Sequence, residues 1–259
     1  MNQFTRYATI CCLSIVPAVI ARASGAMQWL YVAVAVLILC LAKKEALAAS
    51  FLAALIVSVA ALAAGSTLLP RTYDATLWRI DGCLGFDPSA YAMALLHSSA
   101  VLVTIAGHCY VAFPIAIAIA TVCSRNSWRF GAKIGVACVL GYVAYYFVPA
   151  CGPIYFLTGK LAAAPRNAMP SLHLTWALLV WRELRIQSVL GRLFGDVFLV
   201  LTIIATVGLG EHYLVDLIAA VPFWLFVERL CGFAYHRLHP FRQRALRVIE
   251  SSTSAGTSG

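Results

Sequence analysis

The chain has 259 residues, of which 62% are hydrophobic and 11% are charged, and its mean hydropathy is +0.87. A soluble domain of this length cannot bury that much apolar surface, so the composition predicts an all-α, polytopic membrane helical bundle. The net charge of +9 does not indicate nucleic-acid binding, because the basic residues stand in short loops between apolar runs.

Eight apolar runs of the sequence are candidate membrane spans. In chain order they are Tyr7–Ala21, Met27–Leu41, Ala46–Leu69, His108–Cys123, Phe130–Val148, Ser171–Leu184, Phe194–Gly208 and Glu211–Leu230. Several are shorter than the ~20 residues that cross a bilayer, so these helices must extend into flanking segments. We interpret the first run as a retained span rather than a cleaved signal, because another apolar run follows it.

The segments outside these runs differ in character. Pro70–Ser89 is predicted to be an interfacial loop, and Pro149–Pro170 is predicted to be a loop because prolines and glycines recur along it. Ala90–Gly107 is apolar but interrupted by polar residues, so it is either a short interfacial helix or a re-entrant segment. The Ser/Thr/Gly-rich end, Ser251–Gly259, is predicted to be disordered.

The basic residues indicate how the chain crosses the membrane. With the N-terminus inside, the inner segments hold 14 of the 19 Lys and Arg residues, and the outer segments hold five. The five outer residues are Arg22, Arg71, Arg79, Lys160 and Arg166. The positive-inside rule therefore favours cytoplasmic termini. The same orientation puts His173 and His212 together on the outer face.

Nine cysteines are present, and most of them lie in or beside apolar runs, where they serve as small hydrophobic residues. No Cys-x-x-Cys pair occurs in the sequence. Cys83 and Cys151 both fall in outer segments, so the sequence leaves a disulfide between them open.

His212 and Asp216 stand four residues apart at the start of the last apolar run, which predicts that they share a helix face. A carboxylate that accepts a hydrogen bond from one imidazole nitrogen fixes the tautomer and leaves the other nitrogen free to attack. An Asp inside a span is costly unless it is paired, so Asp216 equally fits a structural tie to a neighbouring helix.

His173 follows Pro170 and Ser171, and proline suits the first turn of a helix, so we expect a helix to begin near Pro170. The free backbone amides at such an end, together with the Ser171 hydroxyl, suit a phosphate group. Alternatively, Pro-Ser is an ordinary capping sequence and His173 is an interfacial residue.

Lys160 and Arg166 are the basic residues of the loop before His173. Either cation neutralises phosphate oxygens, and arginine offers a two-pronged fit. The alternative is that both are solvated loop charges or contact lipid headgroups.

A metal site is the competing use of His173, His212 and Asp216. The sequence contains neither an HExxH motif nor a DxxD acidic cluster of the kind that holds Mg²⁺ on a phosphate. A covalent mechanism without a metal or other cofactor is therefore the simpler hypothesis.

At these residues the chain resembles the type 2 phosphatidic acid phosphatase (PAP2) superfamily. Within it, the chain looks most like the inositolphosphotransferase (inositol phosphorylceramide synthase-like) branch and its bacterial relatives. The matching pieces are Met169–His173, Gly210–Asp216 and, ahead of both, Val148–Pro153. The resemblance extends over roughly Ala46 to Leu230.

The resemblance implies a six-helix core in residues 46–230, with its active site at the outer membrane face. Residues 1–45 then form an added transmembrane hairpin, and residues 231–259 form a basic cytoplasmic segment with the disordered tail. The resemblance also implies that His212 attacks phosphorus to form a phosphohistidine and that Asp216 orients His212. His173 would protonate the departing oxygen and then deprotonate the incoming water or alcohol.

Several positions depart from the phosphatase branch. Its Lys-x6-Arg-Pro motif is not met, because Asn167 stands seven residues after Lys160. The phosphatase branch has a glycine directly before the histidine that corresponds to His173, and this chain has Leu172 there. The phosphatase branch also has a Ser-Arg pair ahead of the histidine that corresponds to His212, and this chain has Ala205 and Thr206 there. These differences agree with the transferase-like branch, and they leave open which cations bind the phosphate.

The sequence therefore predicts an integral membrane lipid phosphotransferase or phosphatase that acts at the periplasmic face of a bacterial inner membrane. Its expected substrate is a phospholipid, a sphingolipid or a polyprenyl phosphate. One alternative is a plain lipid or polyprenyl phosphate phosphatase, and another is a non-catalytic lipid-binding or transport protein on the same scaffold. The motifs do not decide whether water or an alcohol is the acceptor.

Overall fold

The computed structural model describes the backbone of residues 26–255, with side chains at 29–162, 164–235 and 237. Within that range the chain has eleven α-helices, one short 3₁₀ helix and no strand. This confirms the predicted all-α class. The predicted span Tyr7–Ala21 lies outside the described residues.

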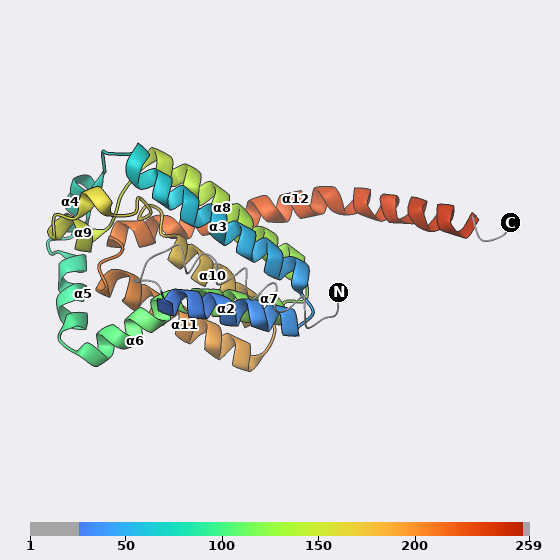
Figure 1. Ribbon diagram of the computed structural model, residues 1–259, viewed down its shortest axis with the longest axis horizontal. Helices are drawn as coiled ribbons and strands as arrows, with labels where there is room; N and C mark the ends of the chain where they lie inside the picture. Colours follow the sequence, from blue (N-terminus) through green and yellow to red (C-terminus); the bar gives the residue numbers. More distant parts are fainter. Residues whose placement is uncertain (1–25, 256–259) are drawn as a thin grey trace.

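Short connections join most of the helices. In chain order the elements are α2 (Ala26–Leu41), α3 (Glu45–Leu68), α4 (Asp74–Gly82), α5 (Pro88–His97), α6 (Ala100–Val111), α7 (Phe113–Cys123), α8 (Ser127–Phe147), α9 (Pro153–Leu157), η1 (Leu161–Ala163), α10 (Leu172–Arg185), α11 (Val189–Gly208) and α12 (Leu214–Ala255). Figure 1 shows α4, α5 and α9 gathered at one end of the bundle, while the second half of α12 projects from the other end.

Three described helices, α3, α8 and α11, are long and apolar enough to cross a membrane, with 24, 21 and 20 residues. The pair α5 and α6 passes the same test together, although the two helices meet at a bend of 116°. The helices α2 and α7 are apolar but shorter. The described residues therefore form a helical membrane bundle, in which three or four spans meet the criteria of length and composition.

The stretch Ala90–Gly107 falls within α5 and α6, and Ser98 and Ser99 separate these two helices. The sequence alone allowed an interfacial helix or a re-entrant segment here. The bend of 116° fits a broken span or a re-entrant loop, in which irregular backbone is tolerated where protein covers it.

The predicted span His108–Cys123 is wrong as one continuous helix. The helix α6 ends at Val111 and α7 begins at Phe113, with Pro114 in its first turn. Proline has no backbone N–H and its ring clashes with the preceding turn, so it starts a helix more readily than it continues one. At the other end of the chain, α12 continues to Ala255, through part of the segment predicted to be a disordered tail.

The helix α10 lies at the centre of the bundle, packed against α7, α8, α11 and α12. Its residues Ala177, Leu179 and Val180 are at most 1% exposed. Its N-cap is Ser171, whose hydroxyl oxygen accepts a hydrogen bond from the Leu174 amide at 3.3 Å. The packing of α10 therefore fixes the position of the side chains in its first turn.

The segment predicted to be a loop before Ser89 contains α4, and two aspartates of α4 fasten other loops. Asp74 is fully buried and accepts hydrogen bonds from the amides of Cys151 (3.1 Å) and Gly152 (3.0 Å) and from the Tyr213 hydroxyl (2.9 Å). A buried carboxylate is costly unless its oxygens have partners, so these donors stabilise it. Asp74 thereby joins the loop before α9 to the loop before α12.

The second aspartate, Asp81, caps α12. Its carboxylate oxygens accept hydrogen bonds from the amides of Leu214 (2.7 Å) and Val215 (2.9 Å), which are the first two residues of α12. The Ser89 hydroxyl also donates to this carboxylate, at 3.3 Å. A negative charge at this position is favourable because it faces the unpaired amides and the positive end of the helix dipole. Asp81 therefore fixes where α12 begins.

We expect Asp81→Asn to lower the free energy of unfolding by about 2 kcal/mol, because an amide offers one acceptor oxygen where two helix amides need partners. Asp87→Asn is the matched control, since Asp87 caps α5 through a single oxygen and asparagine caps helices equally well. Denaturant unfolding of the detergent-purified variants, followed by circular dichroism, measures both effects. Equal stabilities of the two variants would contradict the role assigned to Asp81.

Candidate active site

His212 lies in the loop between α11 and α12, and the prediction that it shares a helix with Asp216 is wrong, because α12 begins only at Leu214. Its side chain is 1% exposed. Its amide donates a hydrogen bond to the carbonyl oxygen of Thr206 at 3.2 Å, which ties the loop to the last turn of α11. The loop backbone therefore positions His212.

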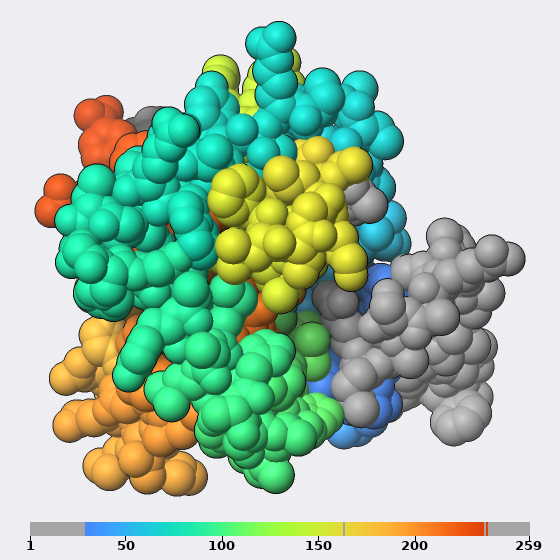
Figure 2. All heavy atoms as spheres, turned by 90° about the vertical axis from the view of Figure 1, so that its left-hand side faces the viewer, coloured from blue at the N-terminus to red at the C-terminus, as the bar shows by residue number. Residues whose placement is uncertain are grey.

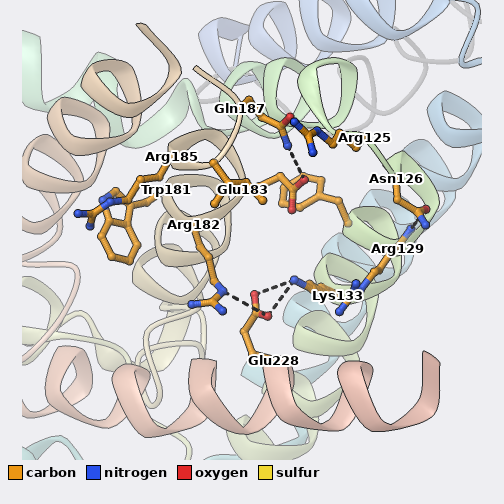
Figure 3. A pocket seen from close by; sticks show the side chains of 12 residues that line it. Arg125, Asn126, Arg129, Lys133, Trp181, Arg182, Glu183, Arg185, Gln187 and Glu228 are labelled. Carbon is orange, nitrogen blue, oxygen red and sulfur yellow. Dashed lines mark hydrogen bonds and ion pairs between the residues drawn. The ribbon is translucent and has the colours of Figure 1, made fainter. Parts of the chain in front are cut away.

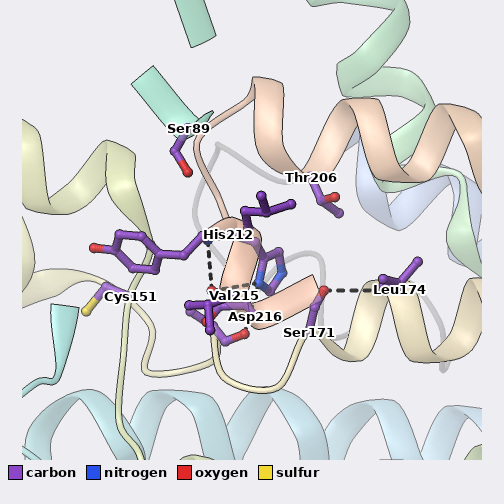
Figure 4. A network of polar contacts seen from close by, with 12 residues as sticks. Ser89, Cys151, Ser171, Leu174, Thr206, His212, Val215 and Asp216 are labelled. Atoms are coloured by element: carbon purple, nitrogen blue, oxygen red, sulfur yellow. Dashed lines mark hydrogen bonds and ion pairs between the residues drawn. The ribbon is translucent and has the colours of Figure 1, made fainter. Parts of the chain in front are cut away.

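The two ring nitrogens of His212 have different surroundings. Nδ1 lies 3.0 Å from the carbonyl oxygen of Ala168 and 3.6 Å from Oδ2 of Asp216. A carbonyl oxygen only accepts, so Nδ1 carries the proton in this contact. Nε2 is buried and has no hydrogen-bond partner among the described residues. In this tautomer the His212 ring, seen beside Asp216 and Ser171 in Figure 4, has its lone pair at Nε2.

Asp216 stands in the first turn of α12 and is fully buried. Its Oδ2 accepts a hydrogen bond from the Tyr213 amide at 2.9 Å, whereas its Oδ1 has no partner within the described part of the chain. The Ser171 amide donates to the backbone carbonyl of Asp216 at 3.2 Å, which joins the start of α10 to the start of α12. At His212 Nδ1, the Ala168 carbonyl is the closer acceptor, and Asp216 adds a nearby negative charge.

His173 lies in the first turn of α10, with its ring centroid 6.0 Å from that of His212. It stacks on Tyr110 at 4.0 Å with an interplanar angle of 19°, and it makes edge contacts with Phe113 and Trp176. The fold therefore brings the two histidines together, as neighbours in one site. In the described part of the chain, no group of three or more His, Cys, Asp or Glu residues is arranged to hold a metal ion.

Ser171 is the N-cap of α10, so the helix begins close to Pro170, as the sequence predicts. Because the Ser171 hydroxyl oxygen accepts from a helix amide, its proton points elsewhere. The Leu172 amide hydrogen-bonds to the Tyr145 phenol oxygen, and the His173 amide follows it in the same first turn. These amides lie at the positive end of a helix of 14 residues, which is an arrangement that attracts anions.

Arg166 is 3% exposed, and most of its donors are directed at the loops around it. Its Nε donates to the carbonyl oxygen of Leu69 at 3.1 Å, and its Nη1 donates to the carbonyl oxygen of Ala164 and to Sγ of Cys151, both at 2.8 Å. Burial raises the pKa of the Cys151 thiol to about 11, so the sulfur stays neutral beside the guanidinium. Arg166 therefore holds these loops and leaves its Nη2 without a described hydrogen-bond partner.

Lys160 is exposed on the loop after α9, and the structure does not bring it into contact with either histidine. Glu211, beside His212, is more enclosed. Burial raises the pKa of the Glu211 carboxyl, against the opposing effects of His212 and of a hydrogen bond with Tyr155. Burial and the Glu211 charge together raise the pKa of Tyr155 to about 12. This phenol therefore stays protonated at neutral pH.

Cys151 and Cys83 are free thiols, so the disulfide that the sequence left open is absent. The loop that carries Cys151 lies at the end of the molecule that Figure 2 shows. There the segments of α4, α5, α6 and α9 surround the face, and orange atoms near the start of α12 are visible between α9 and α6. His212, which is 1% exposed and contacts the Ala168 carbonyl of the loop before α10, lies beneath the loops at this end of the bundle.

Some residues that build the site were not among the predicted ones. Ala168 and Thr206 act through backbone carbonyls, which leave no side-chain signature in a sequence. Tyr110 comes from a helix far along the chain, and no local pattern pairs it with His173. Asp74 and Asp81 could have been singled out from the sequence, because acidic residues are rare in this chain, which holds ten of them.

A family model described as the PAP2 superfamily matches residues 75–230, which is more than half of the chain. The matched range includes His173, His212 and Asp216. No curated protein and no solved structure matches the chain. The resemblance predicted from the two histidine motifs is therefore confirmed at the level of the superfamily.

A glycine lets the loop before α9 approach the loop that carries His212. Gly152 has a φ of 113°, and a Cβ at this position would collide with the backbone carbonyl of Glu211. Beside it, the Ile154 amide donates to the carbonyl oxygen of Gly210 at 2.9 Å, so the two loops meet through their backbones. Only glycine combines this backbone conformation with so close an approach.

We expect Gly152→Ala to lower the free energy of unfolding by more than about 2 kcal/mol, because it adds a backbone collision to the strain of a positive φ. Gly159→Ala is the matched control, since Gly159 has a φ of 70° and open space around its Cβ position. Denaturant unfolding of both variants separates the collision from the strain. A Gly159→Ala variant as unstable as Gly152→Ala would show that loop contact adds nothing.

Proposed function

The chain belongs to the PAP2 superfamily, and on that premise we propose that it is a membrane enzyme that cleaves a phosphoester bond of a lipid, with His212 as the nucleophile. The observation that carries this proposal is the pair of environments at the His212 ring. Its Nδ1 contacts a carbonyl oxygen, and its Nε2 is buried without a described partner near a second histidine. A histidine with a purely structural role normally has both nitrogens hydrogen-bonded.

In the first step, the Nε2 lone pair of His212 forms a bond to phosphorus while the bond between phosphorus and the leaving oxygen breaks. His173 donates a proton to that oxygen, so the leaving group departs as a neutral alcohol or lipid. The phosphorylated ring carries positive charge, which the Asp216 carboxylate and the Ala168 carbonyl stabilise from the Nδ1 side.

In the second step, water or an alcohol attacks phosphorus and His173 accepts its proton. The bond between phosphorus and Nε2 breaks, and its electron pair returns to His212. Water as acceptor releases inorganic phosphate or a phosphorylated headgroup, whereas an alcohol such as inositol becomes the new ester. The same covalent half-reaction therefore serves a hydrolase and an inositolphosphotransferase-like enzyme.

The phosphate oxygens would be held by donors at the start of α10. The His173 amide and the Ser171 hydroxyl suit this role, because they meet at a helix N-terminus. Arg166 would add positive charge and its Nη2 donor, while its other donors hold the surrounding loops. Lys160, which is exposed on the same loop, would supply a second cation at the rim.

We place this site at the periplasmic face of a bacterial inner membrane, with both termini in the cytoplasm. The support is the distribution of Lys and Arg, 14 inside against five outside. Residues 46–230 would form the catalytic core, with an added hairpin in 1–45 and a basic cytoplasmic segment in 231–259. The proposed substrate is a phospholipid, sphingolipid or polyprenyl phosphate, and the covalent mechanism requires no metal or other cofactor.

We expect His212→Ala and His173→Ala each to lower turnover of a lipid substrate by about 100-fold or more, and Asp216→Asn by less. Asp216 is expected to matter less because the Ala168 carbonyl also holds Nδ1. The measurement is product release from radiolabelled phospholipids, in EDTA, with and without myo-inositol. His97→Ala is the matched control, because His97 is exposed at the end of α5 and outside the site.

Wild-type activity in all three site variants would contradict the catalytic assignment. Free phosphate or headgroup formed in EDTA marks a metal-independent hydrolase, and a new lipid that requires the added alcohol marks a transferase. Activity that EDTA abolishes and Mg²⁺ restores would contradict the metal-free mechanism. A non-catalytic lipid-binding protein would turn over no lipid, with or without His212.

A further inference from the structure

A second polar site lies at the end of the bundle opposite the histidines. It is a cavity of about 520 Å³ between the α7–α8 turn, α8, the last turn of α10 and α12 (Figure 3). Its lining includes two carboxylates and five basic side chains, which are Arg125, Arg129, Lys133, Arg182 and Arg185. The described residues that line the cavity therefore carry a net positive charge. Because α10 rises about 1.5 Å per residue, its last turn lies about 15–20 Å from His173.

Both carboxylates of the lining are already engaged by protein groups. Glu228 accepts hydrogen bonds from Lys133 Nζ at 2.9 and 2.8 Å, and Arg182 Nε lies 3.7 Å from it. Glu183 accepts hydrogen bonds from the Ser124 hydroxyl at 2.7 Å and from Gln187 at 3.2 Å. Figure 3 shows the Gln187–Glu183 contact and the contacts of Glu228 at two separate places. The described carboxylates therefore leave the remaining cations of the cavity unneutralised.

Three arginines remain, of which Arg185 lies over the ring of Trp181, while Arg125 and Arg129 stand on either side of the start of α8. Arg125 is exposed, and neither carboxylate of the lining forms an ion pair with it or with Arg129. Arg129 lies with its guanidinium 4.8 Å above the ring of Tyr235, and its Nε is buried without a hydrogen-bond partner among the described residues. A guanidinium N–H that is shielded from water and has no acceptor is unfavourable, so an anion that accepted from Arg129 would be favoured here.

We propose that this cavity is a second, non-catalytic site that binds the phosphate group of an anionic molecule. Guanidinium groups present planar forks that match phosphate oxygens, and Arg125 and Arg129 supply two of them beside each other. The volume falls in the range of small-molecule sites. Basic pockets between membrane helices suit the phosphate of an anionic lipid headgroup, and the same chemistry accepts a soluble phosphate compound.

This site is independent of the histidine chemistry. Its lining shares no residue with the group around His212, and Lys133 with Glu228 forms its floor on α8 and α12. A ligand here would bridge the α7–α8 turn to the end of α10 and to α12, and so stabilise the inner end of the bundle. Failure of the proposed catalysis would leave the binding prediction unchanged, because binding needs no turnover.

The test uses the full chain in neutral detergent, carrying His212→Ala so that no probe is turned over. Short-chain phosphatidylglycerol and inorganic phosphate are titrated separately by calorimetry, with and without Arg125→Gln/Arg129→Gln. Arg192→Gln is the matched control, because Arg192 is an exposed arginine at the same end of the bundle and outside the lining. We expect at least a tenfold loss of affinity in the double variant and no loss in the control.

The pattern of binding identifies the source of the phosphate. Loss of affinity for the lipid probe alone supports a headgroup site, and loss for both probes supports a site for phosphate from either source. No binding of either probe would overturn the proposal. An equal loss of affinity in Arg192→Gln would also overturn it, because binding would then reflect general surface charge. If the double variant does not fold, Arg125→Gln alone provides the test, since this exposed side chain forms no ion pair with a described carboxylate.

Discussion

Buried carboxylates whose oxygens accept hydrogen bonds from backbone amides hold the histidine end of this bundle together. Removing a carboxylate from water is costly, so Asp74 and Asp81 are stable only where the loops before α9 and α12 bring donors to them. Those contacts fix both loops on α4. The amide of Ala168 in turn pairs with the carbonyl of Ala150, and the Ala168 carbonyl contacts the His212 ring. The position of the ring therefore depends on the charges of α4.

The helical class and the nearness of His173 to His212 could be predicted, because apolar runs, charge asymmetry and short motifs lie in local sequence. The place of His212 before α12 could not, since its spacing from Asp216 fits a helix equally well. The contact that caps the first residues of α12 comes from Asp81, which is remote in sequence. Arg166 was predicted as a phosphate ligand, and burial directs most of its donors to loop carbonyls instead. Hydrogen bonds between residues far apart in the chain follow no repeating sequence pattern, so the sequence does not predict them.

The two ends of the bundle differ in their chemistry. At one end, two histidines meet the amides of a helix N-terminus, and at the other, cations outnumber carboxylates around a cavity. The buried helix α10 separates them by about 20 Å along its 14 residues. Arg125 and Arg182 are among the basic residues from which we propose the orientation of the protein in a membrane. Orientation and anion binding would thus use the same residues.

Trapping of a phosphorylated protein tests the covalent step through His212 most directly. The chain is mixed with a radiolabelled aryl phosphate, whose leaving group needs no proton, and is then denatured in alkaline detergent, which preserves phosphohistidine. A histidine nucleophile predicts protein-bound label in the wild type and none in His212→Ala. His173→Ala should hold more label, because the second step lacks its base. Label that persists in His212→Ala, or that survives acid, would contradict a phosphohistidine at this position.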